Sequence, residues 1–154
     1  MKHNTLSAVD LTTCEALIGT QSPFILVLHK GEPVLASILK CVKTLKIPSA
    51  ALSGLGAFEN PTIAYFDLSQ QKYLDKTFPG IYELISLTGN ITQSEGKPMA
   101  HIHVALGNKD YQVIGGHFKD ALVGVTVEIT ITPLQNPIQR ELDPTVGIRL
   151  IATR

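Results

Sequence analysis

Ten residues in the last third of the chain alternate between branched apolar side chains and small or polar ones. Positions 123, 125, 127, 129 and 131 carry valine or isoleucine, while glycine, threonine or glutamate occupies each position between them and position 132. An alternation with a period of two is typical of a β-strand that buries one face and exposes the other. Residues 123–132 therefore predict a half-buried strand, as in an antiparallel sheet with one solvated face.

Only one segment has a convincing helical pattern. Between Pro33 and Pro48 the apolar residues recur at helical spacing, and Pro33 suits the first turn. The helix is expected to end near Ile47, because a proline disfavours helical geometry in the residue before it. Three lysines lie off the apolar stripe, and we expect them to form a solvated face, with a nucleic-acid surface as the alternative: Lys40, Lys43 and Lys46.

The other signals are for strands and turns. Besides residues 123–132, the β-prone segments are residues 24–28, 50–53, 62–66, 82–91, 101–106, 114–117 and 147–151. Gly54-Leu55-Gly56 is interpreted as a tight turn, residues 1–21 as an arm or edge strand, and the tail from Pro133 as a loop up to Gly147. One helix and about seven strands predict an α+β fold, a single domain over residues 1–154 with a mostly antiparallel curved sheet.

The charge balance bears on the class of partner. The chain has 13 basic and 13 acidic residues, so its formal net charge is zero with neutral histidines. Proteins that depend on phosphate contacts usually carry a basic excess, so nucleic-acid binding is disfavoured. A neutral chain also has little electrostatic help with solubility, which fits a protein that covers its surface by forming oligomers.

Cysteine content and hydropathy give a first expectation for the cellular location. Cys14 and Cys41 form no CxxC pair and suggest no disulfide framework, and Cys41 is expected to be a small core residue of the helix. The first residues lack the apolar region of a secretory signal, and no apolar run approaches the roughly 20 residues needed to span a bilayer. We expect a cytoplasmic protein without a membrane partner.

Three of the five histidines are close together in the sequence, at His101, His103 and His117. The first two are at positions i and i+2 of a predicted strand, so their side chains share a face. With a third imidazole from the next strand they form a candidate site for a divalent metal ion, zinc or another. The alternative is that all three are structural residues with ordinary hydrogen bonds.

A simple hairpin brings the three rings together. If His101 lies opposite His117, then Gly107 lies opposite Tyr111 and residues 108–110 form a three-residue loop. Directly opposite residues share a face of the sheet, so His117 joins the other two.

One acidic residue is a candidate for catalysis. Glu83 begins a strand that is otherwise almost free of charge. Beside a metal ion, its carboxylate could act as a general base or orient a water molecule. The alternative is an exposed position at the strand end. On an ideal strand Thr88 and Asn90 lie on the face opposite Glu83. Either these two residues or Glu83 can therefore face the pocket beside the metal ion, so Thr88 and Asn90 compete with Glu83 for that position.

Several motifs together resemble the plant-and-prokaryote-conserved domain (PPC, also PCC) over about residues 24–133. The motifs, in order, are Ser53-Gly54-Leu55-Gly56-Ala57, Tyr82-Glu83-Leu84-Ile85-Ser86-Leu87-Thr88-Gly89-Asn90-Ile91, Gly96-Lys97-Pro98, His101-Ile102-His103 and Gly115-Gly116-His117. The resemblance implies an α+β domain that assembles as a homotrimer, of the stand-alone prokaryotic type. Plant members carry added AT-hook segments for DNA binding, and this chain has no Arg-Gly-Arg core of such a segment.

The family's fold is similar to that of acetolactate decarboxylase, in which an HxH pair and a later histidine hold zinc. By pattern, His101, His103 and His117 match those ligands. The decarboxylase's other catalytic residues have no secure match here, so its reaction is not assigned. Three histidines would leave an open coordination position for a small-molecule ligand, which is typical of catalytic zinc sites. In a small trimeric domain we expect this site to open near a subunit boundary, because pockets favour interfaces.

Two other functions are compatible with the sequence. A DNA-associated or transcription-linked protein is suggested by the plant relatives, against the zero net charge and the missing AT-hook. A protein interaction module with structural histidines is the third hypothesis.

Overall fold

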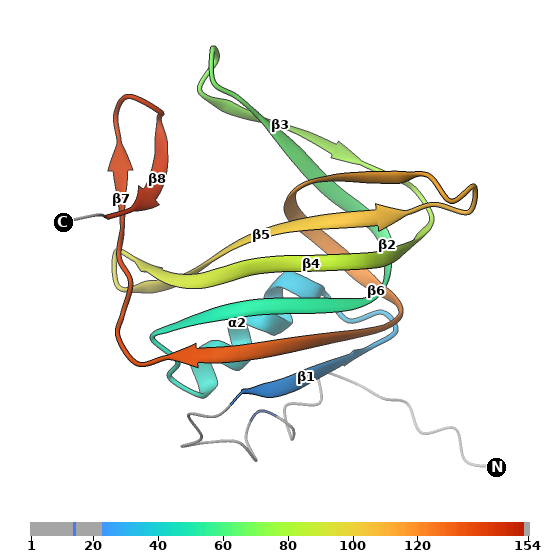
Figure 1. Cartoon of the computed structure of the whole chain (residues 1–154), viewed down its shortest axis with the longest axis horizontal. Coiled ribbons are helices and arrows are strands. Elements are labelled where there is room, and N and C mark those ends of the chain that lie inside the picture. The colour runs from blue at the N-terminus through green and yellow to red at the C-terminus, as the bar shows by residue number, and fades with distance from the viewer. Residues whose placement is uncertain (1–13, 15–22, 153–154) are drawn as a thin grey trace.

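The computed structural model describes Cys14 and residues 23–152, which include helix α2 and eight strands (Figure 1). The helix spans Val34–Thr44. The strands are β1 (Phe24–His29), β2 (Ser49–Asp67), β3 (Lys72–Thr77), β4 (Ile81–Ser94), β5 (Lys97–Gly107), β6 (Val113–Leu134), β7 (Arg140–Asp143) and β8 (Ile148–Ile151). The expectation for residues 1–21 lies, apart from Cys14, outside the described residues.

The main sheet closes on itself. Strand β2 pairs with both β4 and β6, and β5 joins β4 to β6, so these four strands form a ring. Strand β1 extends the sheet from β6, and β3 extends it from β2. Every ladder is antiparallel, which confirms the predicted α+β fold with a mostly antiparallel sheet. The curvature of the ring is visible in the long crossing strands β2 and β6 (Figure 1).

The predicted alternation holds along β6 with one interruption. Val123, Val127, Ile129 and Ile131 are buried, but Val125 is 65% exposed. The register between β2 and β6 shifts between Gly56 and Phe58, so β6 bulges where Val125 lies.

The prediction of a tight turn at Gly54-Leu55-Gly56 is wrong, because all three residues lie inside strand β2. Gly56 has a φ of +141°, and a β-carbon there would lie 2.2 Å from the carbonyl oxygen of Thr126 on β6. The glycine therefore permits a close approach of two backbones inside the sheet, with no reversal of the chain.

Helix α2 covers part of the core. Its fully buried residues Val34, Ile38, Cys41 and Val42 belong to the same apolar cluster as the inward side chains of β1, β5 and β6. Lys40, Lys43 and Lys46 are exposed, as the solvated-face interpretation predicted. The helix ends at Thr44, three residues before the predicted Ile47, and Lys46 has a left-handed φ of 53° that turns the chain toward β2.

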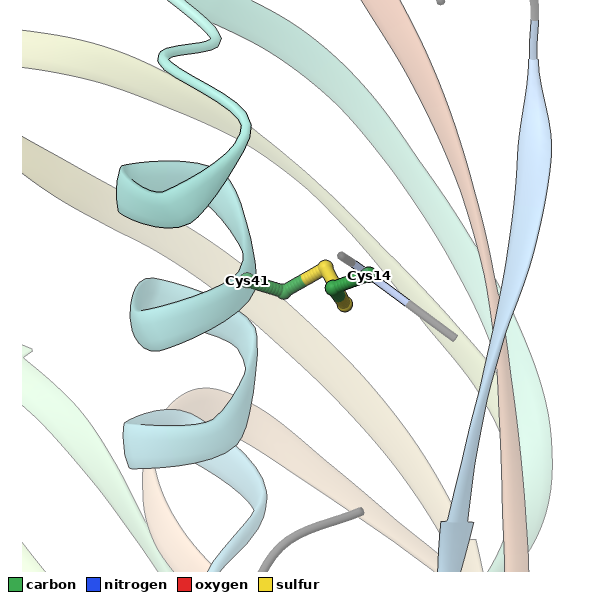
Figure 2. The surroundings of a disulfide bond; sticks show 2 residues. All are labelled: Cys14 and Cys41. Atoms are coloured by element: carbon green, nitrogen blue, oxygen red, sulfur yellow. A yellow bond between two sulfur atoms is a disulfide. The ribbon is translucent and has the colours of Figure 1, made fainter. Parts of the chain in front are cut away.

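The two cysteines form a disulfide beside helix α2 (Figure 2). Their α-carbons are 5.6 Å apart across 27 residues of sequence. Cys41 is buried in the core as predicted, but the expectation of no disulfide is wrong, because the pairing depends on tertiary proximity that spacing alone does not reveal. Disulfides persist mainly in oxidising compartments, so this bond is at odds with the expected cytoplasmic location. No helix among the described residues is long and apolar enough to cross a membrane.

Two hairpins project from the same side of the ring. The β2–β3 hairpin, whose second strand the sequence did not predict, and the β7–β8 hairpin both rise beyond β4 and β5 (Figure 1). The tail from Pro133, predicted as a loop, contains β7, while β8 coincides with the strand predicted at residues 147–151. The hairpins meet where the Gln71 side-chain amide donates a 2.8 Å hydrogen bond to the carbonyl of Thr145.

Candidate metal centre

The β5–β6 hairpin brings the three histidines together. His103 lies directly opposite His117, and Gly107 lies opposite Val113. The predicted register, with His101 opposite His117, is therefore wrong by two residues. A shift of two residues preserves the face of every side chain, so the expected meeting of the three rings is confirmed. His101 lies opposite Asn90 of β4, one strand further around the ring.

The register differs because the hairpin loop is longer than predicted. It spans residues 108–112, where the predicted loop had three residues. The side-chain oxygen of Asn108 accepts hydrogen bonds from the backbone N–H groups of Asp110 and Gln112, each at 2.9 Å. Tyr111 has a left-handed φ of 60°, which a short-range sequence pattern does not predict for tyrosine.

The geometry of the three rings fits a divalent metal ion. The Nε2 atoms of His101 and His103 are 3.3 Å apart, and one ring nitrogen of each histidine lies within 4.8 Å of the other two. Two ligands of a tetrahedral zinc ion, each at about 2.0–2.1 Å, are separated by about 3.3–3.4 Å. The Nδ1 atom of His117 is buried and has no hydrogen-bond partner within the described residues, which fits a nitrogen that a metal ion would bind.

Electrostatics keeps two of the rings neutral. Burial, followed by the nearby His101 and His103 and by Lys119, lowers the pKa of His117 from 6.5 to about 4. The pKa of His101 is also lowered, first by burial and then by the Arg140 guanidinium and His103. Neutral imidazoles have free lone pairs, so these rings are ready to bind a metal ion at neutral pH.

Strand β3 covers one side of this group. The ring of Tyr73 stacks on His117 with centroids 4.5 Å apart. The ammonium group of Lys119 lies 4.7 Å from the centre of the Tyr73 ring and 3.7 Å from the carboxylate of Asp75. Burial raises the pKa of the Tyr73 hydroxyl. The sequence did not single out Tyr73 and Asp75, because strand β3 itself was not predicted.

Strand β7 places an arginine on the other side. The Nη2 atom of Arg140 is 3.2 Å from Nδ1 of His101 and donates to the Asn90 side-chain oxygen at 3.1 Å. Its Nε donates to the Thr92 hydroxyl at 2.9 Å, and its Nη1 donates to the Arg149 carbonyl at 3.1 Å. Arg140 was missed because it lies in the segment interpreted as a proline-rich loop.

The structure does not bring Glu83 into the histidine group. Glu83 is exposed and lies opposite Gly107, four residues beyond His103 on β5. Thr88 lies opposite His103, and Asn90 lies opposite His101. These two residues, and not Glu83, therefore lie beside the histidines. Among the described residues no carboxylate belongs to the group, and the catalytic role of Glu83 stays a prediction.

Comparison with known proteins identifies the same family that the sequence motifs resemble. The model of the Plants and Prokaryotes Conserved (PCC) domain family matches residues 18–135. A plant- and prokaryote-conserved (PPC) protein from Pyrococcus horikoshii is 32% identical with a TM-score of 0.80, over 86% of this chain and 92% of its own. A protein from Archaeoglobus fulgidus described as metal-containing is 29% identical with a TM-score of 0.79, over 88% of this chain and 95% of its own.

Two further structures and the curated proteins complete the comparison. A protein from Bacteroides thetaiotaomicron whose description proposes DNA binding is 26% identical with a TM-score of 0.83, over 88% of this chain and 93% of its own. Acetolactate decarboxylase from Bacillus subtilis subspecies spizizenii is 15% identical with a TM-score of 0.56, over 76% of this chain and 55% of its own, so this likeness concerns the fold alone. No curated protein matches the chain.

Proposed function

Since this chain belongs to the Plants and Prokaryotes Conserved (PCC) domain family, we propose that it is a homotrimeric protein that binds a divalent metal ion through His101, His103 and His117. The 3.3 Å separation of the His101 and His103 Nε2 atoms carries the proposal, because it equals the ligand spacing of a tetrahedral zinc ion. The unpartnered Nδ1 atom of His117 and the metal-containing relative support it.

The ligand set favours zinc with an open position. Three imidazoles suit zinc better than magnesium or calcium, which prefer oxygen ligands. Such an ion would act as a Lewis acid toward a small-molecule ligand at its fourth position. The residues of this chain hold the ion and orient the rings, and the Tyr73 ring stacked on His117 restricts the movement of that ligand.

Metal content of protein purified without a histidine tag tests the proposal. We expect close to one zinc ion per native chain by elemental analysis, and a large loss of zinc in His101→Ala. His29→Ala is the matched control, because His29 is exposed at the end of β1. Equal zinc in the native protein and in His101→Ala would refute the site.

A chelator should lower the melting temperature of the native protein. An ion that binds only the folded chain at 100 times its dissociation constant stabilises it by about 2.7 kcal/mol. His103→Ala should show no response to chelator, and because His103 is exposed the substitution should leave the fold intact. Equal chelator responses in the two proteins would leave the interaction module with structural histidines as the better hypothesis.

The outer face of the sheet supports the proposed assembly. Val27 of β1 and Leu55 of β2 both lie opposite Glu128 of β6, so the three side chains form a row across adjacent strands. Leu55 is 54% exposed, and with Ile25 and Ile85 it lines a shallow depression of about 360 Å³. Exposed apolar side chains that gather on one face, here with Glu128 among them, favour a protein interface.

Light scattering tests the oligomeric state. The native protein should have the mass of three chains at micromolar concentration, and Leu55→Glu should dissociate it because a charge replaces an interface side chain. Leu68→Glu is the matched control, because Leu68 is exposed in the β2–β3 loop outside this face. A native monomer would contradict the trimer.

Glu83 lies at the edge of the same face, where it lines a second depression together with Leu55 and Val125. In the proposed trimer Glu83 would therefore face a neighbouring subunit, and its predicted action as a general base would be on a group of that subunit. Glu83→Gln should then leave zinc content unchanged.

DNA association is the second candidate function. A solved relative whose description proposes DNA binding favours it, while the zero net charge of this chain opposes it. Binding that depends on phosphate contacts weakens steeply as salt rises. We expect duplex DNA binding to be weak at low salt, and tight binding with a steep salt dependence would favour this alternative.

A further inference from the structure

Arg140 lies against the Nδ1 edge of the His101 ring. Its Nη2 atom is 3.2 Å from Nδ1 of His101, while Nε2 of the same ring is 3.3 Å from Nε2 of His103. Arg140 is only 6% exposed. Its guanidinium also donates hydrogen bonds to three groups on β4 and β8, which are the Thr92 hydroxyl, the Asn90 side-chain oxygen and the Arg149 carbonyl. These bonds fix the guanidinium beside the ring.

The contact with Arg140 decides which nitrogen of His101 carries the proton. A guanidinium can only donate hydrogen bonds, so Nδ1 accepts from Arg140 and the proton of the neutral ring is on Nε2. The protonated Nε2 then donates to Nε2 of His103. The three side chains therefore form one chain of hydrogen bonds, from Arg140 through His101 to His103.

Binding of a metal ion requires the opposite arrangement of His101. An imidazole binds an ion through the nitrogen that has a free lone pair, and Nε2 of His101 is the atom at ligand spacing from His103. A ring with its lone pair on Nε2 carries its proton on Nδ1, where it meets the N–H group of Arg140. Two donors cannot share a hydrogen bond, so His101 must give up its contact with Arg140 to bind the ion.

The position of Arg140 is the reverse of the usual support for a metal ligand. A histidine that binds a metal ion normally donates its second ring N–H to a carboxylate or a carbonyl, which secures the lone pair on the other nitrogen. Arg140 presents a donor at this position, and its positive charge repels a divalent cation on the same ring. Among residues 23–152 no carboxylate forms an ion pair with Arg140, so this charge is not compensated.

We propose that Arg140 is a positioning residue that lowers the affinity of the histidine triad for its divalent cation, because it holds His101 with the proton on Nε2. The triad then binds its ion reversibly, in competition with the hydrogen bonds that join Arg140, His101 and His103. Asn90, directly opposite His101 on β4, offers a side-chain oxygen that can accept the Nδ1 proton when the ion binds. The inference rests on the proposed metal function.

Zinc affinity, measured by competition with a chromophoric chelator, tests the inference. Arg140→Met removes both the donor and the charge, so it should bind zinc about 10- to 100-fold more tightly than the native protein, the range expected for a hydrogen bond to a charged group. Arg140→Lys keeps the charge and a donor, and it should remain closer to the native affinity. An arginine that only supports the fold would give the opposite sign, because poorly oriented ligands bind zinc more weakly.

The proton position gives a second measurement, on the native chain itself. Nitrogen-15 NMR of the imidazole rings in chelator-treated protein should show His101 protonated on Nε2, with His101→Gln identifying its signals. Arg140→Met should increase the fraction protonated on Nδ1. A native His101 ring protonated on Nδ1 would overturn the inference, and this result does not depend on the folding of any Arg140 variant.

The controls separate this inference from the metal proposal. Arg149→Met removes a nearby arginine side chain that is paired with Glu95, and zinc affinity should be unchanged. If native protein binds zinc and Arg140→Met binds it equally well or more weakly, the role of Arg140 is refuted and the metal site stands. If neither protein binds zinc, both proposals fail.

Discussion

Acid should destabilise the metal-free protein through His117. The folded chain holds the pKa of this ring near 4 by burial and by its histidine neighbours, while in the unfolded chain the pKa is close to its ordinary value of 6.5. Above pH 6.5 the ring is neutral in both states. Between pH 6.5 and 4 the unfolded chain binds the proton and the folded chain does not, so stability falls as the pH falls. Below about pH 4 the loss is complete.

The size of this effect follows from the two pKa values. A fall from 6.5 to about 4 corresponds to at most about 3.4 kcal/mol of unfolding free energy. The His117 ring is only half-buried, so solvent screening reduces this to about 1–2 kcal/mol. For a chain of 154 residues, that loss lowers the melting temperature by about 2–8 °C.

Denaturant unfolding in the presence of chelator, from pH 7.5 to pH 4, measures the loss directly. The native protein should lose about 1–2 kcal/mol more than His117→Gln over this range. His29→Gln should follow the native curve, because His29 is exposed on β1 and lies outside the histidine triad. Parallel pH curves for native protein and His117→Gln would show that burial of His117 has no energetic consequence and would refute the reasoning.

Two further substitutions test the core and the disulfide. Cys14→Ser removes the cross-link that closes 27 residues and should lower the unfolding free energy by about 3.5 kcal/mol; alkylation followed by mass spectrometry should show two free thiols in native protein only after reduction. Phe58→Ala removes a fully buried ring whose centroid is 5.2 Å from that of Phe118, and should cost about 3–5 kcal/mol in chemical denaturation.

The sequence predicted the elements whose signal is local. Helix α2 and strand β1 have complete apolar patterns of their own, and the alternation of residues 123–132 survives in β6 apart from Val125. Strand β3 has no such pattern, since five of its six residues are exposed, and it forms because β2 provides a pairing edge. The joining of two predicted segments into the 19-residue strand β2 also depends on its two partners, β4 and β6.

The candidate site also has a part that local sequence patterns predict and a part that they do not. The sharing of one face by His101 and His103 follows from strand periodicity, and the position of His117 tolerates a register error of two residues. Arg140 and Tyr73 reach the site from strands that are distant in sequence, and their contacts with His101 and His117 arise only when both hairpins fold over the ring. No pattern within the sequence near either residue predicts such a contact.

The stacking of Tyr73 on His117 has a consequence for metal affinity at low pH. Protons compete with metal ions for imidazole nitrogens, so a ligand whose pKa is lowered by burial keeps its lone pair available to lower pH. Tyr73, 4.5 Å from the His117 ring, contributes to that burial. Tyr73→Ala should raise the pKa of His117 and shift the loss of zinc binding to higher pH, whereas Tyr65→Ala, which removes a 72% exposed ring from β2, should not. Zinc titrations at pH 7.5 and 5.5 measure this: the ratio of the two affinities should be larger for Tyr73→Ala than for the native protein, and an equal ratio would mean that the ring of Tyr73 leaves the protonation of His117 unchanged.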